Sequence, residues 1–293
     1  QEAVQNKNWR KAMAEEIRAL EKNDTWTIES LPPGKKPISC KWVYRVKYKS
    51  DGTIERYKAG LVVRGDHQIE GFDYNETFAP VAKMTSVRCF LAVAVAKGWA
   101  LHQLDVNNAF LHGDLQEEVY MKLPPGFKGN DNTKVCRLRK SLYGLRQALR
   151  QWFAKLSSKL CEYGFIWSYA DYSLFTYQKG DIFMSVLVYV DDIVLAGNNT
   201  VACIHFKHYL NTCFSIKDLG PLKYFLGIEV ARGPQGLFLS QRKYALEIID
   251  ECGLLGTKPV DFPMEQNHRL AQATGKLLTD VNRCQRLIGR LIY

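Results

Sequence analysis

The stretch IFMSVLVYVDDIVLA, residues 182–196, is the strongest indication of the fold. Its apolar runs, 182–190 and 193–196, are typical of two neighbouring strands, and only Asp191 and Asp192 separate them. A purely structural two-residue hairpin has Gly or Asn at positions of positive φ, whereas this turn offers two adjacent carboxylates. Their repulsion beside apolar strands is costly unless a cation is bound, so we predict a divalent metal site. The alternative is an exposed acidic turn without a function.

A third carboxylate, Asp105, ends the strand predicted over residues 101–106. An isolated Asp at a strand end is more often a turn or helix-cap residue, so alone it indicates little. The stretch LDVNNAFLHGDL, residues 104–115, contains it, and the family resemblance given below makes it a candidate partner of Asp191 and Asp192.

The chain has 293 residues, of which 46% are hydrophobic and 12% aromatic, and this predicts a globular protein of one to three domains. Its longest apolar runs, 90–96 and 186–190, are far shorter than the roughly 20 residues of a membrane helix, which argues against a membrane protein. Eight single cysteines without a C-x-x-C pair, and a start without a leader, predict an intracellular protein that is not secreted. The start at Gln1 also suggests an internal segment of a longer chain.

The formal net charge of +10 is concentrated in two segments. Residues 35–64 hold nine basic side chains against two acidic ones, and residues 134–155 hold seven against none, so each segment carries +7 and the rest of the chain −4. Within the first segment, two strand-like runs, 41–49 and 56–63, are joined through Asp51-Gly52, which predicts a basic hairpin. Two basic surfaces on a slightly acidic remainder indicate a polyanion partner; the alternative is two solvated faces without a ligand.

A series of short strings, in order over about residues 9–293, resembles the reverse transcriptase of copia-type long-terminal-repeat retrotransposons. The strings are Thr25-Trp26, Lys41 to Val43, Tyr57 to Ala59, Leu104 to Leu115, Ser141 to Leu145, Gln147-Ala148, Tyr189 to Asp192, Lys217 to Gly220, Tyr224 to Glu229 and Leu239 to Tyr244.

This resemblance implies an α+β fold, that of a right-hand polymerase with fingers, a palm of antiparallel sheet and helices, and a partial thumb. The implied boundaries are 1–80 and 113–151 for the fingers, 81–112 and 152–231 for the palm, and 232–293 for a truncated thumb.

The resemblance also implies the catalytic residues. Asp105, Asp191 and Asp192 would be catalytic and would hold two Mg²⁺ ions, with the carbonyl of Val106 as an additional ligand and Mn²⁺ as an accepted substitute. Two such ions activate the primer 3′-hydroxyl and stabilise the leaving pyrophosphate, and hard oxygen ligands suit Mg²⁺.

Nucleotide and primer contacts follow from the same resemblance. Phe110 would act as an aromatic gate against a ribose 2′-hydroxyl, although an ordinary core Phe is the alternative. Gln147 would lie over the incoming nucleotide and template. Lys47 and Lys58 would contact the triphosphate, where solvated surface lysines are the alternative, and Lys217 would stand where a proton donor for pyrophosphate is often found. The implied primer and template contacts are Tyr189, Tyr224, Phe225, Leu226 and Gly227.

The implied function is RNA-directed DNA polymerisation, with an RNA template, a DNA primer or template, dNTPs and other segments of the retrotransposon polyprotein as partners. The implied location is a cytoplasmic virus-like particle. Two departures favour an alternative, a degenerate fragment that binds nucleic acid without polymerising: Gly60 and Leu149 stand where the family usually has Arg and Pro. A two-metal nuclease is a third interpretation, in which Phe110, Gln147 and the Tyr224 string would have no role.

Overall fold

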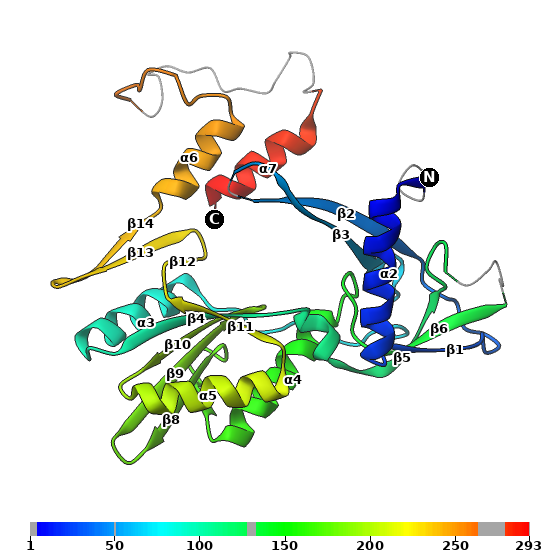
Figure 1. Ribbon diagram of the computed structural model, residues 1–293, viewed down its shortest axis with the longest axis horizontal. Coiled ribbons are helices and arrows are strands. Elements are labelled where there is room, and N and C mark those ends of the chain that lie inside the picture. The colour runs from blue at the N-terminus through cyan, green and yellow to red at the C-terminus, as the bar shows by residue number, and fades with distance from the viewer. Residues whose placement is uncertain (1–4, 50, 128–132, 263–278, 293) are drawn as a thin grey trace. The chain divides into compact units, whose positions relative to one another are not determined.

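The computed structural model describes residues 5–49, 51–127, 133–262 and 279–292 and divides into two compact units, Gln1–Pro221 and Leu222–Tyr293 (Figure 1). Helices and strands are mixed throughout, as the α+β prediction requires. The unit boundary falls inside the predicted palm segment 152–231, so the string that begins at Tyr224 belongs to the C-terminal unit. The division of the N-terminal unit into fingers and palm stays a prediction.

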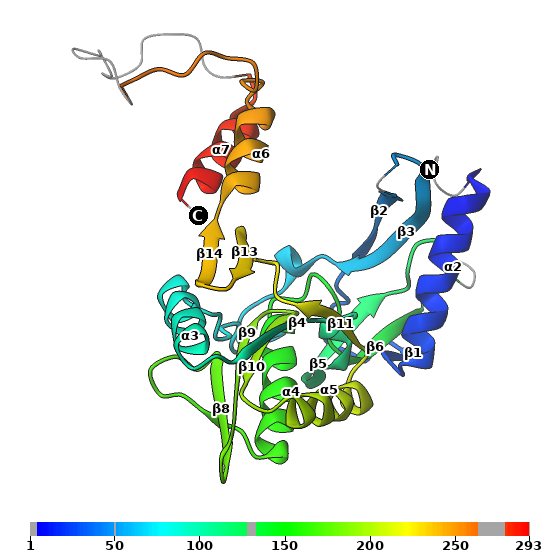
Figure 2. The same ribbon diagram turned by 60° about the vertical axis from the view of Figure 1, so that its left-hand side comes forward.

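An antiparallel six-stranded sheet, in the order β11-β4-β10-β9-β8-β7, forms the centre of the N-terminal unit. Helices α4 and α5 cover one face of it, and Figures 1 and 2 show α3 on the other side. Strands β9 and β10 are nearly continuous apolar runs because both of their faces are buried. The bounds are β4 Ala100–Val106, β7 Ile166–Trp167, β8 Leu174–Lys179, β9 Ile182–Tyr189, β10 Asp192–Gly197, β11 Ile216–Pro221, α3 Met84–Ala96, α4 Ala148–Tyr163 and α5 Thr200–Cys213.

The main core lies between this sheet and the two helices on its first face. Leu104 and Val106 of β4 point into it, so Asp105 between them points to the opposite face. Trp152, Leu156 and Phe206 are the large buried side chains that the helices contribute.

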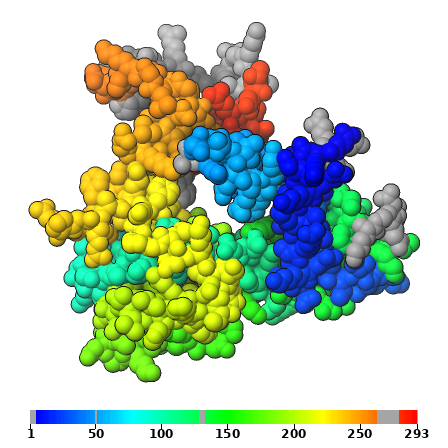
Figure 3. All heavy atoms as spheres, viewed as in Figure 1, coloured from blue at the N-terminus to red at the C-terminus, as the bar shows by residue number. Residues whose placement is uncertain are grey.

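The predicted basic hairpin is present as β2 (Cys40–Tyr48) and β3 (Ile54–Val63). Its aromatic face packs on α2 (Lys7–Lys22), where Trp9 makes edge contacts with Tyr44 and Tyr57 at 5.0 and 4.7 Å between ring centroids. The space-filling view shows the hairpin atoms lying against those of α2 (Figure 3). Helix α2 thereby fixes the hairpin through one of its faces.

A second core joins this hairpin to a three-stranded sheet, β1-β6-β5. Its fully buried members include Leu20 of α2, Leu61 of β3 and Leu142. The remaining elements of the N-terminal unit are β1 Trp26–Ser30, β5 Asp114–Lys122, β6 Lys134–Lys140 and the 3₁₀ turns η1 Gly65–His67 and η2 Ala109–His112.

Gly144 marks a close crossing between the end of β3 and residues 141–145. Its φ is +95°, and a Cβ there would overlap the carbonyl oxygen of Val63 and lie 2.8 Å from Cγ1 of Val62. We therefore expect Gly144→Ala to lower the free energy of unfolding by about 2 kcal/mol or more, measured by urea denaturation. Gly34→Ala is the control, because φ is +79° there but nothing lies within 4 Å. Equal losses in both variants would contradict the crowding at Gly144.

The C-terminal unit consists of a three-stranded sheet, β12-β13-β14, and two helices. The hydroxyl of Tyr244 in α6 donates to the carbonyl of Arg290 in α7 at 2.8 Å, and the Arg290 guanidinium pairs with Glu251 at 2.7 Å. The bounds are β12 Tyr224–Phe225, β13 Ile228–Gly233, β14 Gly236–Ser240, α6 Arg242–Glu251 and α7 Val281–Ile292. None of the helices described in the two units combines the length and apolarity needed to span a membrane.

Candidate active site

The hairpin between β9 and β10 brings the predicted carboxylates together. Tyr189 pairs with Asp192, so the turn consists of Val190 and Asp191, and Asp192 is the first residue of β10. This corrects the sequence interpretation, which placed both acids in the turn. Asp192 is also paired with Asp105 of β4, and directly paired residues share a face of the sheet.

The turn is held in an unusual conformation. Val190 has a φ of 57°, which a β-branched residue rarely adopts. Its carbonyl accepts a 2.7 Å hydrogen bond from the indole of Trp152, and the carbonyl of Asp191 accepts one of 3.1 Å from the amide of Val106. These two contacts fix the turn to α4 and β4, so the backbone that carries Asp191 is anchored on both sides.

A row of polar side chains crosses the sheet at this point. Asp105 pairs with Lys217 of β11 on one side and with Asp192 on the other, and Asp192 pairs in turn with Tyr189. The structure therefore places four of the predicted site residues, from four strands, on one face of the sheet.

Burial and neighbouring negative charges raise the pKa of two carboxylates at this place, Asp191 and Asp192. Burial raises the pKa of Asp191, and the nearby charge of Asp105 raises it further. Burial likewise raises the pKa of Asp192, as do the charges of Asp191 and Asp105, while a hydrogen bond from Gln103 opposes the shift. Carboxylates that repel each other in a partly buried place are a donor set that a divalent cation would stabilise.

The arrangement does not form a closed metal cage. Among the described residues, no group of three or more His, Cys, Asp or Glu side chains is arranged so that it could hold a metal ion. Mg²⁺ is usually held by one or two carboxylates together with substrate phosphates and water, which the row of Asp105 and Asp192 fits. Val106, predicted as a further ligand through its carbonyl, is the last residue of β4 and follows Asp105 directly, and its side chain is buried.

Phe110 is the second residue of η2, which begins directly after the αL residue Asn108, and it packs against both cores. Its ring makes an edge-to-face contact with that of Tyr143, at 4.8 Å between centroids and 70° between planes. Burial raises the pKa of Tyr143, and the charges of Asp191, Glu16 and Asp105 raise it further. We did not single out Tyr143 from the sequence, although the string Ser141 to Leu145 contains it.

The predicted contact of Gln147 with a nucleotide needs correction. Gln147 is 0% exposed, its amide donates to the carbonyl of Asp73 at 3.0 Å, and its side-chain oxygen accepts from Gln68 at 2.9 Å. Arg146 extends this network through its backbone amide, which donates to the side-chain oxygen of Gln68 at 2.8 Å. Gln147 therefore supports the loop after η1 from inside, because no part of its side chain faces solvent.

The basic side chains of the hairpin share the face opposite to α2. Strand register pairs Arg45 with Lys58 and Lys47 with Arg56, so all four lie on the same face, and Gly60 lies on it as well. Lys58 is exposed and Lys47 half-buried. The sequence predicted a charged hairpin, and the register shows which face carries the charge.

The string from Tyr224 forms a tight hairpin in the C-terminal unit. Tyr224 pairs with Glu229 and Phe225 with Ile228, and Leu226 and Gly227 both have positive φ, at 48° and 77°. Two successive positive φ values are those of a type I′ turn. Phe225 is buried, and the ammonium of Lys243 lies 5.1 Å from the centroid of the Tyr224 ring.

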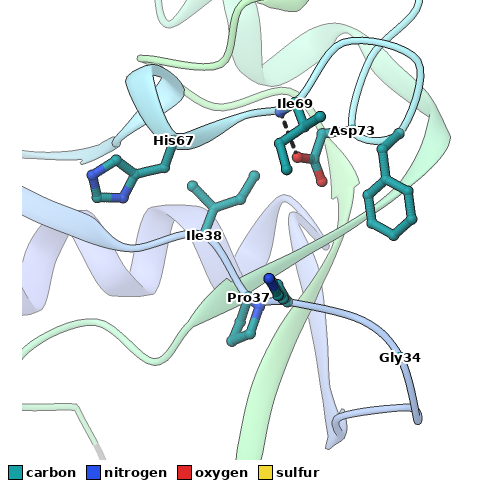
Figure 4. A pocket seen from close by; sticks show the side chains of 8 residues that line it. Gly34, Pro37, Ile38, His67, Ile69 and Asp73 are labelled. Atoms are coloured by element: carbon teal, nitrogen blue, oxygen red, sulfur yellow. Dashed lines mark hydrogen bonds between the residues drawn. The ribbon is translucent and has the colours of Figure 1, made fainter.

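A pocket of about 470 Å³ lies between residues 34–38 and 67–73 and contains none of the predicted site residues (Figure 4). On the side formed by residues 67–73, the backbone amide of Ile69 donates a 2.8 Å hydrogen bond to the Asp73 carboxylate. Ile38, 4% exposed, belongs to the second core. The pocket is thus part of the loop network that Gln147 supports.

Comparison with known proteins decides the family. A family model described as reverse transcriptase (RNA-dependent DNA polymerase) matches residues 23–266. The chain belongs to the reverse transcriptase family. It is 46% identical over its full length to the retrovirus-related Pol polyprotein from transposon RE2 of Arabidopsis thaliana. It is 45% identical to that from transposon RE1 of the same plant, and 40% identical, over 89% of the chain, to that from transposon TNT 1-94 of Nicotiana tabacum.

The predicted resemblance to copia-type reverse transcriptases is thereby confirmed. The chain spans 20% of the length of each of these three polyproteins, so it corresponds to one segment of them. Divalent metal dependence is a general property of the reverse transcriptase family, and the carboxylate row is the place in this member that suits it.

Proposed function

We propose that this chain is an RNA-directed DNA polymerase that extends a DNA primer with dNTPs. The observation that carries the proposal is the row formed by Asp105, Asp192 and Lys217, with Asp191 in the adjoining anchored turn. Asp105, Asp191 and Asp192 would hold two Mg²⁺ ions, with the Val106 carbonyl as a further ligand and Mn²⁺ as a substitute. Bound there, the metal activates the primer hydroxyl and neutralises charge on the departing pyrophosphate.

The chain's own residues would position the reactants. Asp105 and Asp191 would orient the reacting phosphate, and Lys217, paired with Asp105 from the neighbouring strand β11, would offer a proton to the leaving pyrophosphate. Phe110 would meet the sugar of the incoming nucleotide. Tyr189 lies beside Asp192 and would contact the primer end, as would the hairpin from Tyr224 to Gly227.

The basic face of the β2–β3 hairpin would bind phosphates. Lys47 and Lys58 lie on it with Arg45 and Arg56, and a surface with one sign of charge suits either the triphosphate or the backbone of the RNA template or DNA. The other partners would be the remaining segments of the polyprotein, in a cytoplasmic particle.

The competing proposal is a degenerate chain that binds nucleic acid without polymerising. It depends on Gly60 and Leu149, where the family usually has Arg and Pro. Leu149 lies in the first turn of α4 and packs its apolar side chain against the main core. Proline is tolerated in the first turn of a helix, so either residue is compatible with α4. Gly60 leaves the basic face without the cation that Arg would add, yet a Cβ at this position would meet nothing within 4 Å. Neither departure touches the carboxylate row.

Gly60→Arg is expected to lower the KM for dNTPs about tenfold, because it adds a guanidinium that can pair bidentately with phosphate. Steady-state primer extension measures this, and Gly60→Lys should recover only part of the gain. The free energy of unfolding should stay within about 0.5 kcal/mol of the wild type. An unchanged KM in an active enzyme would show that this face does not meet the triphosphate.

Three assays on one protein separate the proposals. Magnesium-dependent extension of a primed template supports polymerisation. Cleavage of the same template without extension would favour the nuclease, and salt-sensitive binding without either reaction, in Mg²⁺ or Mn²⁺, would favour the degenerate chain.

A further inference from the structure

The support behind Phe110 is a part of the site that the carboxylate row does not account for. Phe110 lies in a short 3₁₀ turn and packs, partly buried, on both cores, and its ring has a further aromatic neighbour. That neighbour is Tyr143, whose ring stands nearly perpendicular to it at 4.8 Å. An edge-to-face pair of this kind resists rotation of either ring.

Tyr143 is itself held rigidly. Its carbonyl accepts a 2.8 Å hydrogen bond from the amide of Val63, and the following residue is the closely crossed Gly144. The flanking side chains Leu142 and Leu145 are 0% and 5% exposed in the second core. The backbone on both sides of Tyr143 is therefore fixed, whereas the ring itself is only half-buried.

The charges of the carboxylates also reach Tyr143. After burial, the charges of Asp191 and Asp105 contribute to raising the pKa of its phenol. Among the described residues the Tyr143 hydroxyl has no hydrogen-bond partner, and the contact with Phe110 uses only the ring.

We propose that Tyr143 is a positioning residue that holds the Phe110 ring against the sugar of the incoming nucleotide and thereby sets the discrimination between deoxyribonucleotides and ribonucleotides. This inference rests on the proposed polymerase function and on Phe110 as the gate. Tyr143 acts through Phe110 and needs no contact of its own with the nucleotide.

The test is the ratio of kcat/KM for a dNTP to kcat/KM for the matching rNTP, measured by primer extension. Tyr143→Ala should lower this ratio about three- to tenfold, the factor that one aromatic pair supports. Tyr143→Phe keeps the ring and should keep the ratio of the wild type. Tyr169→Ala, which removes an 85% exposed tyrosine in another loop, is the control and should change nothing.

A double-mutant cycle identifies the route of the effect. Phe110→Val should lower the ratio strongly, and adding Tyr143→Ala to it should lower the ratio no further, because the ring to be positioned is absent. Additive effects, or a Tyr143→Ala enzyme that loses kcat/KM equally for both nucleotides, would overturn the inference and leave the polymerase function standing. A wild type that extends no primer would overturn both.

Discussion

Asp191→Asn is expected to reduce magnesium-dependent primer extension by at least about a thousandfold, because a neutral amide would not hold the metal that we propose activates the primer hydroxyl. The reaction is followed as product formed per minute from a labelled primer. Asp181→Asn is the matched control: this exposed acid lies at the opposite end of β9, in the turn before it, and its loss should leave extension unchanged.

The same substitution should not destabilise the fold. Burial and the charge of Asp105 raise the pKa of Asp191 in the folded state. A carboxyl whose folded pKa lies above its unfolded value favours folding only while it is protonated, and this contribution is lost as the pH rises through the folded pKa. At pH 7 we therefore expect Asp191→Asn to unfold at an equal or higher urea concentration than the wild type. Robust extension, or marked destabilisation, would contradict the assignment of Asp191.

Trp152→Ala is expected to lower the free energy of unfolding by about 3–5 kcal/mol, the usual cost of removing a buried Trp. Trp152 is 0% exposed in the main core and lies 5.1 Å from the Phe214 ring. Its indole also fixes the carbonyl of Val190, next to Asp191. Chemical denaturation measures the loss, and Trp167→Ala, at a 43% exposed Trp, should change stability by less than about 1 kcal/mol.

Trp152→Phe keeps part of the packing and removes the hydrogen bond. A phenyl ring stays in the core, whereas the N–H donor to Val190 and part of the indole volume are lost, so it should cost about 1–3 kcal/mol. Because Val190 needs this anchor to keep its positive φ, extension should fall more in this variant than stability alone explains. Equal activity of Trp152→Phe and the wild type would show that the indole does not position the turn.

The local pattern of the sequence was sufficient for the central hairpin. Two apolar runs around Asp191 and Asp192 predicted β9 and β10, and the resemblance added Asp105 from a strand far away in the chain. The turn predicted from the sequence, Asp191-Asp192, is one residue later than the turn in the structure, Val190-Asp191. The hydrophobic pattern of a strand does not show at which residue its pairing ends. Only the register revealed that Asp192 belongs to β10 and shares a face with Asp105.

Long-range contacts could not be predicted in the same way. Gln147 looks like an exposed contact beside a helix start, yet Gln68 and the Asp73 carbonyl, more than 70 residues earlier, bury both ends of its amide. Tyr143 gains its place from Phe110, and the sequence pattern of neither residue indicates the other. For the basic hairpin, the sequence showed the charge, but the face of the hairpin that carries it became clear only from the strand register.

The central claim is that the carboxylate row performs template-directed DNA synthesis. It is tested most directly by offering the wild-type chain a DNA primer annealed to an RNA template, with Mg²⁺ and the four dNTPs, beside Asp191→Asn. The account predicts products that lengthen to the end of the template, require all four dNTPs and disappear in the variant. Binding of the primed template without extension in either Mg²⁺ or Mn²⁺, or extension that persists in Asp191→Asn, would contradict it.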